Sequence, residues 1–417
     1  MIYLKKVSSY LFYLLPILLI SGPFLSDLCI SFIGLIYLIY RNNKILTDIL
    51  SSNFIKIFFI FYFYIVVRSI LSSYPLLSLE SSLFYFRFGF FILAITYLLE
   101  NNFIKLKTLI IAYSSIIIFI SLDCIYQFIF KVNIVGYPAY GNRLTSFFTN
   151  GNSESGFKNL IVGSYLSRLL PVIIALIYLN LKKINLRNTI FIILFIDLVS
   201  IATIITGERV TLLYISTIIF STIFINKNYR KLFIINFVVF LVLAFNLIFS
   251  NEGLKERIIS ETIVSLNIPS NENVIISKQH DPLIRNGIKL FNDNIFFGHG
   301  TKTFRVLCEK YKNKNLHCNT HPHNTYVQLL AETGLVGCLF VFSFFIFILY
   351  KLISFVLKSF FQEYNNINSS YFYILIAIFN NLFIYQPTGS FFNNWLSILY
   401  FIPVSLFVYL SKNKNVF

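Results

Sequence analysis

The chain consists of long apolar runs separated by short polar breaks, and about twelve of these runs reach the length of a membrane span. A hydrocarbon core about 30 Å thick is crossed by roughly 20 apolar residues in a helix, because lipid offers backbone amides no hydrogen-bond partner. Hydrophobic residues make up 57% of the sequence and charged residues 12%, which is unlike a soluble domain. The sequence therefore predicts an all-α polytopic membrane protein.

The expected spans lie at residues 9–22, 25–40, 54–71, 82–99, 108–130, 162–181, 188–206, 209–226, 232–250, 324–350, 370–386 and 394–411. They divide the chain into a membrane domain of about nine spans at 1–250, a partly helical loop at 251–322, and three last spans at 323–417. A smaller loop at 131–161 interrupts the first of these parts. The first run lacks a small-residue cleavage pattern, so no signal peptide is expected to be removed.

The net charge of +17 comes from lysines and arginines that occupy every second break. Positive charge is retained in the cytoplasm, which places both termini inside and the loops at 131–161 and 251–322 outside. The cations are spread over short breaks and form no continuous stripe. We therefore expect membrane lipid around the protein and no nucleic-acid partner.

All five histidines fall within the outside loop or directly before the span that follows it: His280, His299, His317, His321 and His323. Histidine has the ordinary pKa nearest neutrality, which suits it to transfer protons. His323 precedes a span, and Gly334 and Gly337 return close to its helix face. A single histidine at a helix start is also typical of a capping or solvated residue, and that alternative stays open.

Two cysteines near these histidines allow further interpretations. Cys308 and Cys318 flank a polar run, and an oxidising compartment would permit a disulfide between them. The alternative is a zinc site that would also use His317, His321 and His323. Their spacing matches no familiar zinc motif, so we predict no metal and no cofactor.

Arg209, in the sequence Thr-Gly-Glu-Arg, lies in an outside break, against the usual placement of positive charge. Snorkelling to lipid headgroups is the alternative for an arginine at the end of a span. Arg285 stands in the outside loop. One guanidinium group can donate two parallel hydrogen bonds to phosphate oxygens, and several arginines could converge on one anionic group. The other arginines expected at outer span ends are Arg68, Arg87, Arg143 and Arg168.

Two motifs resemble the bacterial O-antigen ligases and the related O-antigen polymerases of the same membrane superfamily. The first is His323-Asn324, nine residues, Gly334, two residues and Gly337; the second is Arg209 followed by Leu213. The resemblance covers roughly residues 200–340, and residues 143–145 and 163–168 look similar to an earlier outside segment of the family. Hydropathy alone links the first hundred residues to the family.

The resemblance implies transfer of a preassembled glycan from an undecaprenyl diphosphate carrier to lipid A-core oligosaccharide, on the periplasmic face of the bacterial inner membrane. It implies His323 as general base, with Arg209 and Arg285 stabilising the diphosphate. Arg143, Arg168, Arg68, Arg87 and Asn324 are expected to bind diphosphate or glycan. Direct displacement would invert the anomeric centre and needs neither metal nor nucleotide sugar.

Two other functions remain open, and protein is a third possible acceptor of the glycan. A polymerase would extend the glycan on its carrier, and its donor chemistry would be the same. A non-enzymatic transporter of lipid-linked sugars would need charges lining a central path, whereas the polar residues here gather on one side. The motifs favour the ligase.

Overall fold

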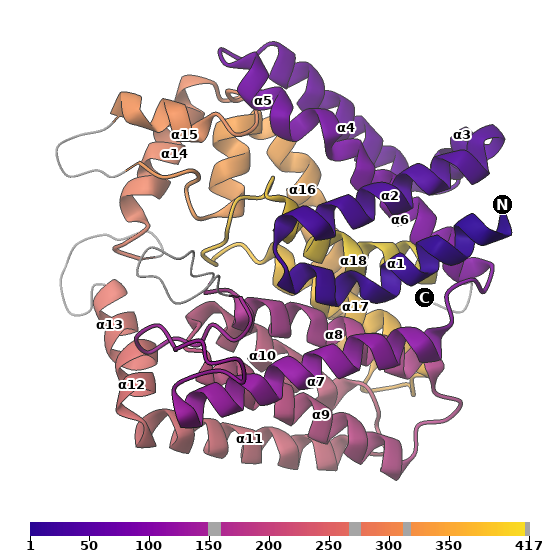
Figure 1. Cartoon of the computed structure of the whole chain (residues 1–417), viewed down its shortest axis with the longest axis vertical. Coiled ribbons are helices and arrows are strands. Elements are labelled where there is room, and N and C mark those ends of the chain that lie inside the picture. The colour runs from indigo at the N-terminus through magenta and orange to yellow at the C-terminus, as the bar shows by residue number, and fades with distance from the viewer. Residues whose placement is uncertain (149–159, 267–276, 312–317, 413–417) are drawn as a thin grey trace.

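The computed structural model describes residues 1–148, 160–266, 277–311 and 318–412, and these residues form helices joined by turns (Figure 1). Within the described ranges the extended structure is limited to two isolated β-bridges in the loop after α7. The first half contains α1 (Ile2–Ile20), α2 (Pro23–Arg41), η1 (Asn42–Lys44), α3 (Ile45–Leu50), α4 (Asn53–Ile70), α5 (Pro75–Ser82), η2 (Leu83–Tyr85), α6 (Phe86–Glu100), α7 (Leu106–Phe130), α8 (Val162–Asn180) and α9 (Leu186–Ile205). The second contains α10 (Arg209–Ser221), η3 (Thr222–Phe224), α11 (Arg230–Ser250), α12 (Glu252–Lys255), η4 (Glu256–Ser260), α13 (Glu261–Ser265), α14 (Asp281–Asp293), α15 (Phe304–Leu307), η5 (Cys308–Tyr311), α16 (Thr325–Lys358), α17 (Asn366–Leu382) and α18 (Asn394–Ser411).

Ten helices in the described part of the chain are long and apolar enough to cross a membrane. The predicted all-α polytopic fold is therefore confirmed. The other two expected spans are shorter elements. Residues 209–226 correspond to the apolar helix Arg209–Phe224, and residues 370–386 correspond to α17, which has 17 residues.

The core of the bundle is formed by α8, α17 and α18. Nearly every residue of these three helices is buried, and α17 packs along both α8 and α18. Peripheral helices differ: α11 buries only Phe233 and Phe240. Figure 1 shows α17 and α18 in the middle of the bundle and α11 at its lower edge. An apolar helix with so little protein around it is suited to face lipid.

Asparagine begins five of the helices. In each case its side-chain oxygen accepts a backbone N–H of the first turn, which satisfies a donor that has no partner within the helix. The capping residues are Asn185, Asn251, Asn324, Asn365 and Asn393. Asparagines in the polar breaks therefore stabilise the starts of these five described helices.

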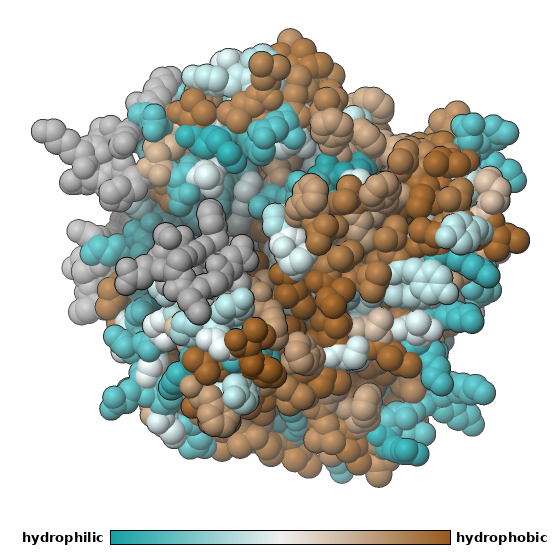
Figure 2. Space-filling model, viewed as in Figure 1, coloured by the Kyte–Doolittle hydropathy of each residue, from teal (hydrophilic) through white to brown (hydrophobic). Residues whose placement is uncertain are grey.

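The two ends of the bundle differ in structure. Figure 1 shows α12–α15 at one end and both chain termini toward the opposite end. Figure 2 shows hydrophobic residues over the middle of the visible face and hydrophilic residues gathered toward the ends. Within the loop at 251–322, residues Asp281–Asp293 form α14, which packs on α16. The loop at 251–322 is thus partly helical, as predicted.

Candidate active site

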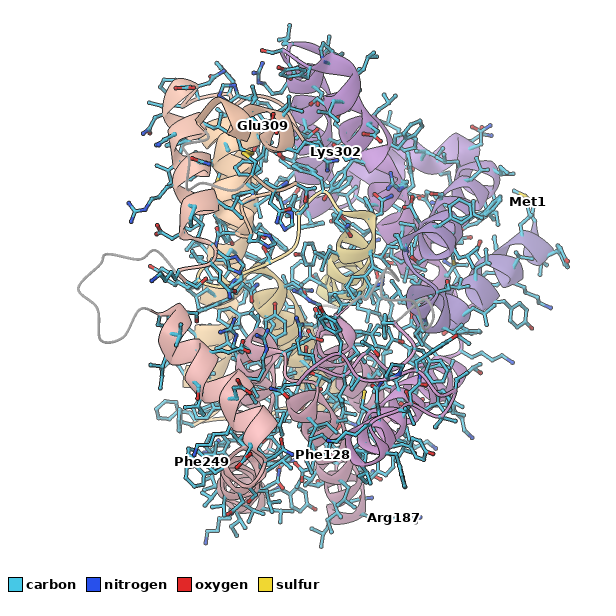
Figure 3. The ribbon with its side chains drawn as sticks, turned by 60° about the vertical axis from the view of Figure 1, so that its left-hand side comes forward. Met1, Phe128, Arg187, Phe249, Lys302 and Glu309 are labelled. Atoms are coloured by element: carbon cyan, nitrogen blue, oxygen red, sulfur yellow. A yellow bond between two sulfur atoms is a disulfide. The ribbon has the colours of Figure 1, made fainter. Side chains whose placement is uncertain are left out.

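A cavity of about 1000 Å³ opens at the end of the bundle that carries α12–α15. Six cations line it: Arg143, Arg168, Arg209, Arg257, Lys302 and Arg305. Among the described residues of its walls, Glu208 is the one carboxylate. Figure 3 looks toward this end, with Lys302 in its upper half and Phe249, at the end of α11, in its lower half. Such an excess of positive charge in a cleft favours an anionic ligand.

Arg209 is the first residue of α10 and contacts α13. Its Nη1 donates to the carbonyl oxygen of Glu261 (3.0 Å) and to Oγ of Ser265 (3.1 Å). No other hydrogen bond of the guanidinium is seen within the described residues, so it keeps donors for a ligand. Leu213, four residues further along the helix, also lines the cavity. Both residues of the second motif are therefore at this site.

Glu208 connects the start of α10 to the start of α8. Its carboxylate accepts the N–H groups of Gly163 (2.6 Å) and Ser164 (3.0 Å), where negative charge stabilises a helix N-terminus. Burial raises the pKa of Glu208 to about 7, although Arg143 and these N–H groups act in the opposite direction. The carboxylate is therefore a positioning group for α8.

Arg143 comes from the loop after α7. Its Nη2 donates to the carbonyl oxygen of Leu160 (2.8 Å), and its buried Nε has no partner among the described residues. Burial lowers the pKa of Arg143, and the negative charge of Glu208 opposes that shift. An arginine held in this way has donors left for an anion that enters the cavity.

Arg168, on α8, is 5% exposed and is held on every side. Its Nε donates to Oγ of Ser164 (3.0 Å), its Nη2 to the hydroxyl of Tyr214 (2.8 Å), and its Nη1 to Oδ1 of Asn381. The guanidinium also lies over the rings of Tyr214 and Tyr400. Arg168 therefore contributes fixed positive charge to the cavity from the core of the bundle.

Three of the five histidines meet beside the cavity. The His323 ring stacks on His280, with 4.7 Å between ring centroids, and lies 4.1 Å from the ring of His321. His280 and His321 line the cavity, whereas His323 contacts it through them. His299 lies elsewhere, with Nε2 2.9 Å from the carbonyl oxygen of Leu290, and His317 falls outside the described residues.

These three rings are held in their neutral form. Burial lowers the pKa of His323 to about 3 and that of His321 to about 4, and the neighbouring His280 ring acts in the same direction on both. Burial also lowers the pKa of His280, as does the positive charge of Arg209. A neutral imidazole has one nitrogen free to accept a proton.

The acceptor nitrogen of His323 can be assigned. Oδ1 of Asn319 accepts the N–H of Thr320 (2.7 Å), which turns the Asn319 Nδ2 toward Nε2 of His323 at 3.1 Å. Since the amide nitrogen only donates, Nε2 is the acceptor and Nδ1 carries the hydrogen. Asn319 is exposed, so another hydrogen-bond donor could take its place at the lone pair of Nε2.

Asn324 fixes the backbone next to this histidine. Its Oδ1 caps α16 through the N–H groups of Tyr326 and Val327, and its Nδ2 donates to the carbonyl oxygen of Ile384 (2.8 Å). The carbonyl oxygen of His323 accepts the N–H of Thr388 (2.9 Å). With its side chain used in this way, Asn324 holds the segment around 384–388 and the start of α16 together.

The glycines of the first motif shape α16. At Gly334 (φ 65°, ψ −171°) the helix is interrupted, and the N–H groups of Leu335 and Val336 bond instead to the carbonyl oxygens of Ile295 and Phe296. A Cβ at Gly334 would lie 2.3 Å from the oxygen of Phe296. The segment after α14 therefore packs against α16 at this break.

Three arginines expected at the site lie away from the cavity wall. Arg68 donates through Nε (3.0 Å) and Nη2 (2.5 Å) to the carbonyl oxygen of Gly298 and so secures the segment after α14. Arg87 pairs with Asp27 at 2.8 Å. Arg285, whose side chain is 48% exposed, pairs with Asp281 at 2.6 Å, which raises the pKa of the arginine.

The two cysteines near the histidines are joined. Cys308 and Cys318 form a disulfide with 5.9 Å between their Cα atoms. Their sulfurs are therefore not thiolates, which zinc coordination would require. Within the described residues no three His, Cys, Asp or Glu side chains form a group that could hold a metal ion.

Sequence reasoning did not select Arg257, Lys302 or Arg305 for the site. All three belong to the loop expected outside the membrane, where positive charge is disfavoured, and that placement is the signal that could have identified them. Arg257 donates through Nε to the carbonyl oxygen of Gly207 (3.3 Å) and pairs with Glu261. The buried Nε of Arg305 has no partner among the described residues.

Comparison with known proteins supports the sequence motifs. Residues 190–342 match the family model described as O-antigen ligase, a segment that holds Arg209, Arg257, Lys302, Arg305 and all five histidines. No curated protein matches the chain significantly. Both motifs, from Arg209 to Gly337, lie within the matched segment, so the match supports the resemblance to the O-antigen ligase family that they indicated.

Proposed function

We propose that this protein transfers a preassembled glycan from undecaprenyl diphosphate to lipid A-core oligosaccharide on the periplasmic face of the inner membrane. The observation that carries the proposal is the cavity itself, with six cations, one carboxylate and three neutral histidines at its edge. The diphosphate is the anion that such a cavity suits, and the histidines are the groups that could accept a proton from a sugar hydroxyl.

The reaction is a direct displacement. The acceptor hydroxyl gives its proton to Nε2 of His323 as its oxygen forms a bond to the anomeric carbon. The bond from that carbon to the diphosphate oxygen breaks, and undecaprenyl diphosphate leaves with the electron pair. The proton then passes from His323 to solvent. Attack and departure on opposite faces invert the anomeric centre.

Electrostatic stabilisation of the leaving diphosphate is the largest task of the site. Arg209 retains free donors at the end of α10, and Arg168 and Arg143 supply charge from α8 and from the loop before it. Fixed donors aimed at developing negative charge can contribute about 3–4 kcal/mol each to the lowering of a barrier. Arginine cations supply this charge in the proposal, so the mechanism needs no metal.

His323 acts as general base from its neutral state. The acceptor hydroxyl takes the place of the Asn319 amide as donor to Nε2. A pKa of about 3 makes the free imidazole a weak base, but a bound diphosphate places negative charge in the neighbouring cavity and favours the protonated ring. Binding of the lipid-linked glycan therefore makes His323 a stronger base before the acceptor sugar reacts.

The remaining predicted residues have different roles in the proposal. Arg285 would reach the diphosphate after leaving Asp281, so Asp281→Asn should preserve transfer while Arg285→Gln lowers it. Equal activity of Arg285→Gln and wild type would remove Arg285 from the mechanism. We assign Arg68 and Asn324 to positioning, because their donors hold Gly298 and Ile384.

The proposed orientation places both termini in the cytoplasm and the cavity in the periplasm, with the outside loop at 251–322 between the membrane parts at 1–250 and 323–417. A cysteine at Thr320 should then react with an impermeant thiol reagent added to intact cells, and one at Ser51 should not. Both positions are exposed. If Ser51→Cys reacted and Thr320→Cys did not, the protein would have the opposite orientation.

The deciding experiment uses purified protein, a diphosphate-linked glycan and lipid A-core, with wild type compared with His323→Ala. We expect glycan on the core lipid with wild type and none with the variant. Longer glycan on the carrier would identify a polymerase instead. Movement of the lipid-linked glycan across vesicles without either product would identify a transporter.

A further inference from the structure

A second, smaller groove adjoins the basic cavity. It has a volume of about 460 Å³ and lies between α2, α5 and α6. Lys302, Phe392 and Asn394 line both the groove and the cavity, so the two spaces meet at these residues. Neither family motif includes a residue of this groove.

The groove has a polar upper part and an apolar lower part. Asp27, Glu80 and Arg87 lie beside Lys302 and Asn394 where the groove meets the cavity, whereas Leu35, Leu38 and Phe90 line it further along α2 and α6. From Asp27 to Leu38 the helix rises about 16 Å. This distance is about half the thickness of the hydrocarbon core, so the groove reaches through roughly one leaflet.

The charges in the groove are balanced, in contrast to those in the cavity. Arg87 pairs with Asp27 at 2.8 Å, and Lys302 pairs with Glu80 at 2.9 Å. Asn394 joins the first pair, since its Nδ2 donates to Asp27 (3.1 Å) and its Oδ1 accepts from Arg87 (2.9 Å). A neutral set of carboxylate, amide and guanidinium groups suits sugar hydroxyls better than a diphosphate.

We infer that this groove binds the lipid-anchored acceptor saccharide. Its acyl chain would lie against Leu35 and Leu38, and its saccharide would contact the network of Asp27, Arg87 and Asn394 and extend past Lys302 into the cavity. The inference rests on the proposed function, because it supplies the second substrate of that reaction. It also gives Arg87 a place beside the acceptor instead of the diphosphate.

Ser31→Trp tests the inference by filling the groove. Ser31 lines it, and its hydroxyl bonds only within its own helix, to the carbonyl oxygen of Asp27 (2.8 Å). The matched control is Phe32→Trp, because Phe32 is 46% exposed on the same helix and does not line the groove. We expect Ser31→Trp to raise KM for lipid A-core about tenfold or more with an unchanged Kd for the diphosphate-linked glycan. The control should match wild type in both.

Two kinetic or binding results would overturn the inference. One is an equal KM for lipid A-core in the two variants. The other is a higher Kd of Ser31→Trp for the diphosphate-linked glycan. A photo-crosslinking residue at position 31, with position 32 as its control, tests the groove without catalysis. Lipid A-core should crosslink at 31 and not at 32, and failure to crosslink at 31 would refute the site. If wild type transfers no glycan, the proposed function fails, and the crosslink still decides the groove.

Discussion

The rings of His280 and His323 are stacked, with 4.7 Å between their centroids, although the two residues lie 43 positions apart in the sequence. His280 precedes α14 and His323 precedes α16, so the contact joins the starts of two helices. Two rings this close cannot both carry a positive charge without a cost. The neutral state of the site is therefore built into the packing of α14 against α16.

This packing predicts that stability depends on pH in the acid range. In the folded protein the pKa of His323 is held at about 3 and that of His321 at about 4, below the ordinary value of about 6.5. As the pH falls through about 6.5, the unfolded chain binds protons before the folded chain does, so folding stability decreases until the pH reaches the folded pKa values. The melting temperature in detergent should fall steadily from pH 7 to pH 4.5.

The double variant His321→Gln with His323→Gln provides the control. It removes two of the three neighbouring rings, so its melting temperature should change less over the same range. Activity gives a second measurement: kcat/KM of wild type, which reports the free enzyme, should show no acid limb near pH 6.5. A limb there would mean that His323 titrates with an ordinary pKa, and would contradict the neutral stack.

Arg209→Lys distinguishes phosphate recognition from snorkelling. Lysine keeps the charge but loses the planar fork, so an ammonium that donates to Glu261 and Ser265 has one donor left and cannot bind phosphate with two. We expect kcat to fall about a hundredfold, in the range seen when one donor to developing charge is lost. Transfer by the purified variant is the measurement.

Arg187→Lys is the matched control, because Arg187 lies near the start of α9, at the end opposite to the residues that adjoin Glu208. Its activity should stay within about twofold of wild type. Unchanged activity in Arg209→Lys as well would show that this arginine serves as an anchor to lipid headgroups.

Much of the architecture could be predicted because lipid imposes strong rules on helices. Hydropathy located the spans, and the loop at 251–322 was correctly expected to be partly helical, as α14 shows. The gathering of histidines in one stretch correctly indicated a local cluster, and three of them meet beside the cavity. The topology put Arg209 and His323 on the same side of the membrane, but it could not show that the two residues meet.

The partners of individual side chains could not be predicted. Topology places Arg68, Arg87 and Arg285 at one end of the bundle but does not show that Gly298, Asp27 and Asp281 bind them. The contacts of Arg68 and Arg87 depend on how segments distant in the sequence pack together, which periodicity does not describe, whereas Asp281 and Arg285 lie four residues apart on α14. Gly334 illustrates the same limit, because helical spacing treats it as part of a continuous helix face, whereas the backbone there leaves the helix.

Gly334→Ala tests this break in α16. The position has φ 65°, which costs an L-residue about 1–3 kcal/mol, and the new Cβ would lie 2.3 Å from the oxygen of Phe296. The segment after α14 would have to move away, and with it the contacts that hold His280 near His323. We expect a lower melting temperature and loss of transfer. Leu335→Ala, at the next residue and 37% exposed, removes side-chain atoms and adds none at the break, so it should change both quantities little. Equal stability of Gly334→Ala and wild type would mean that α16 can close into a continuous helix, and that the docked segment does not need the glycine.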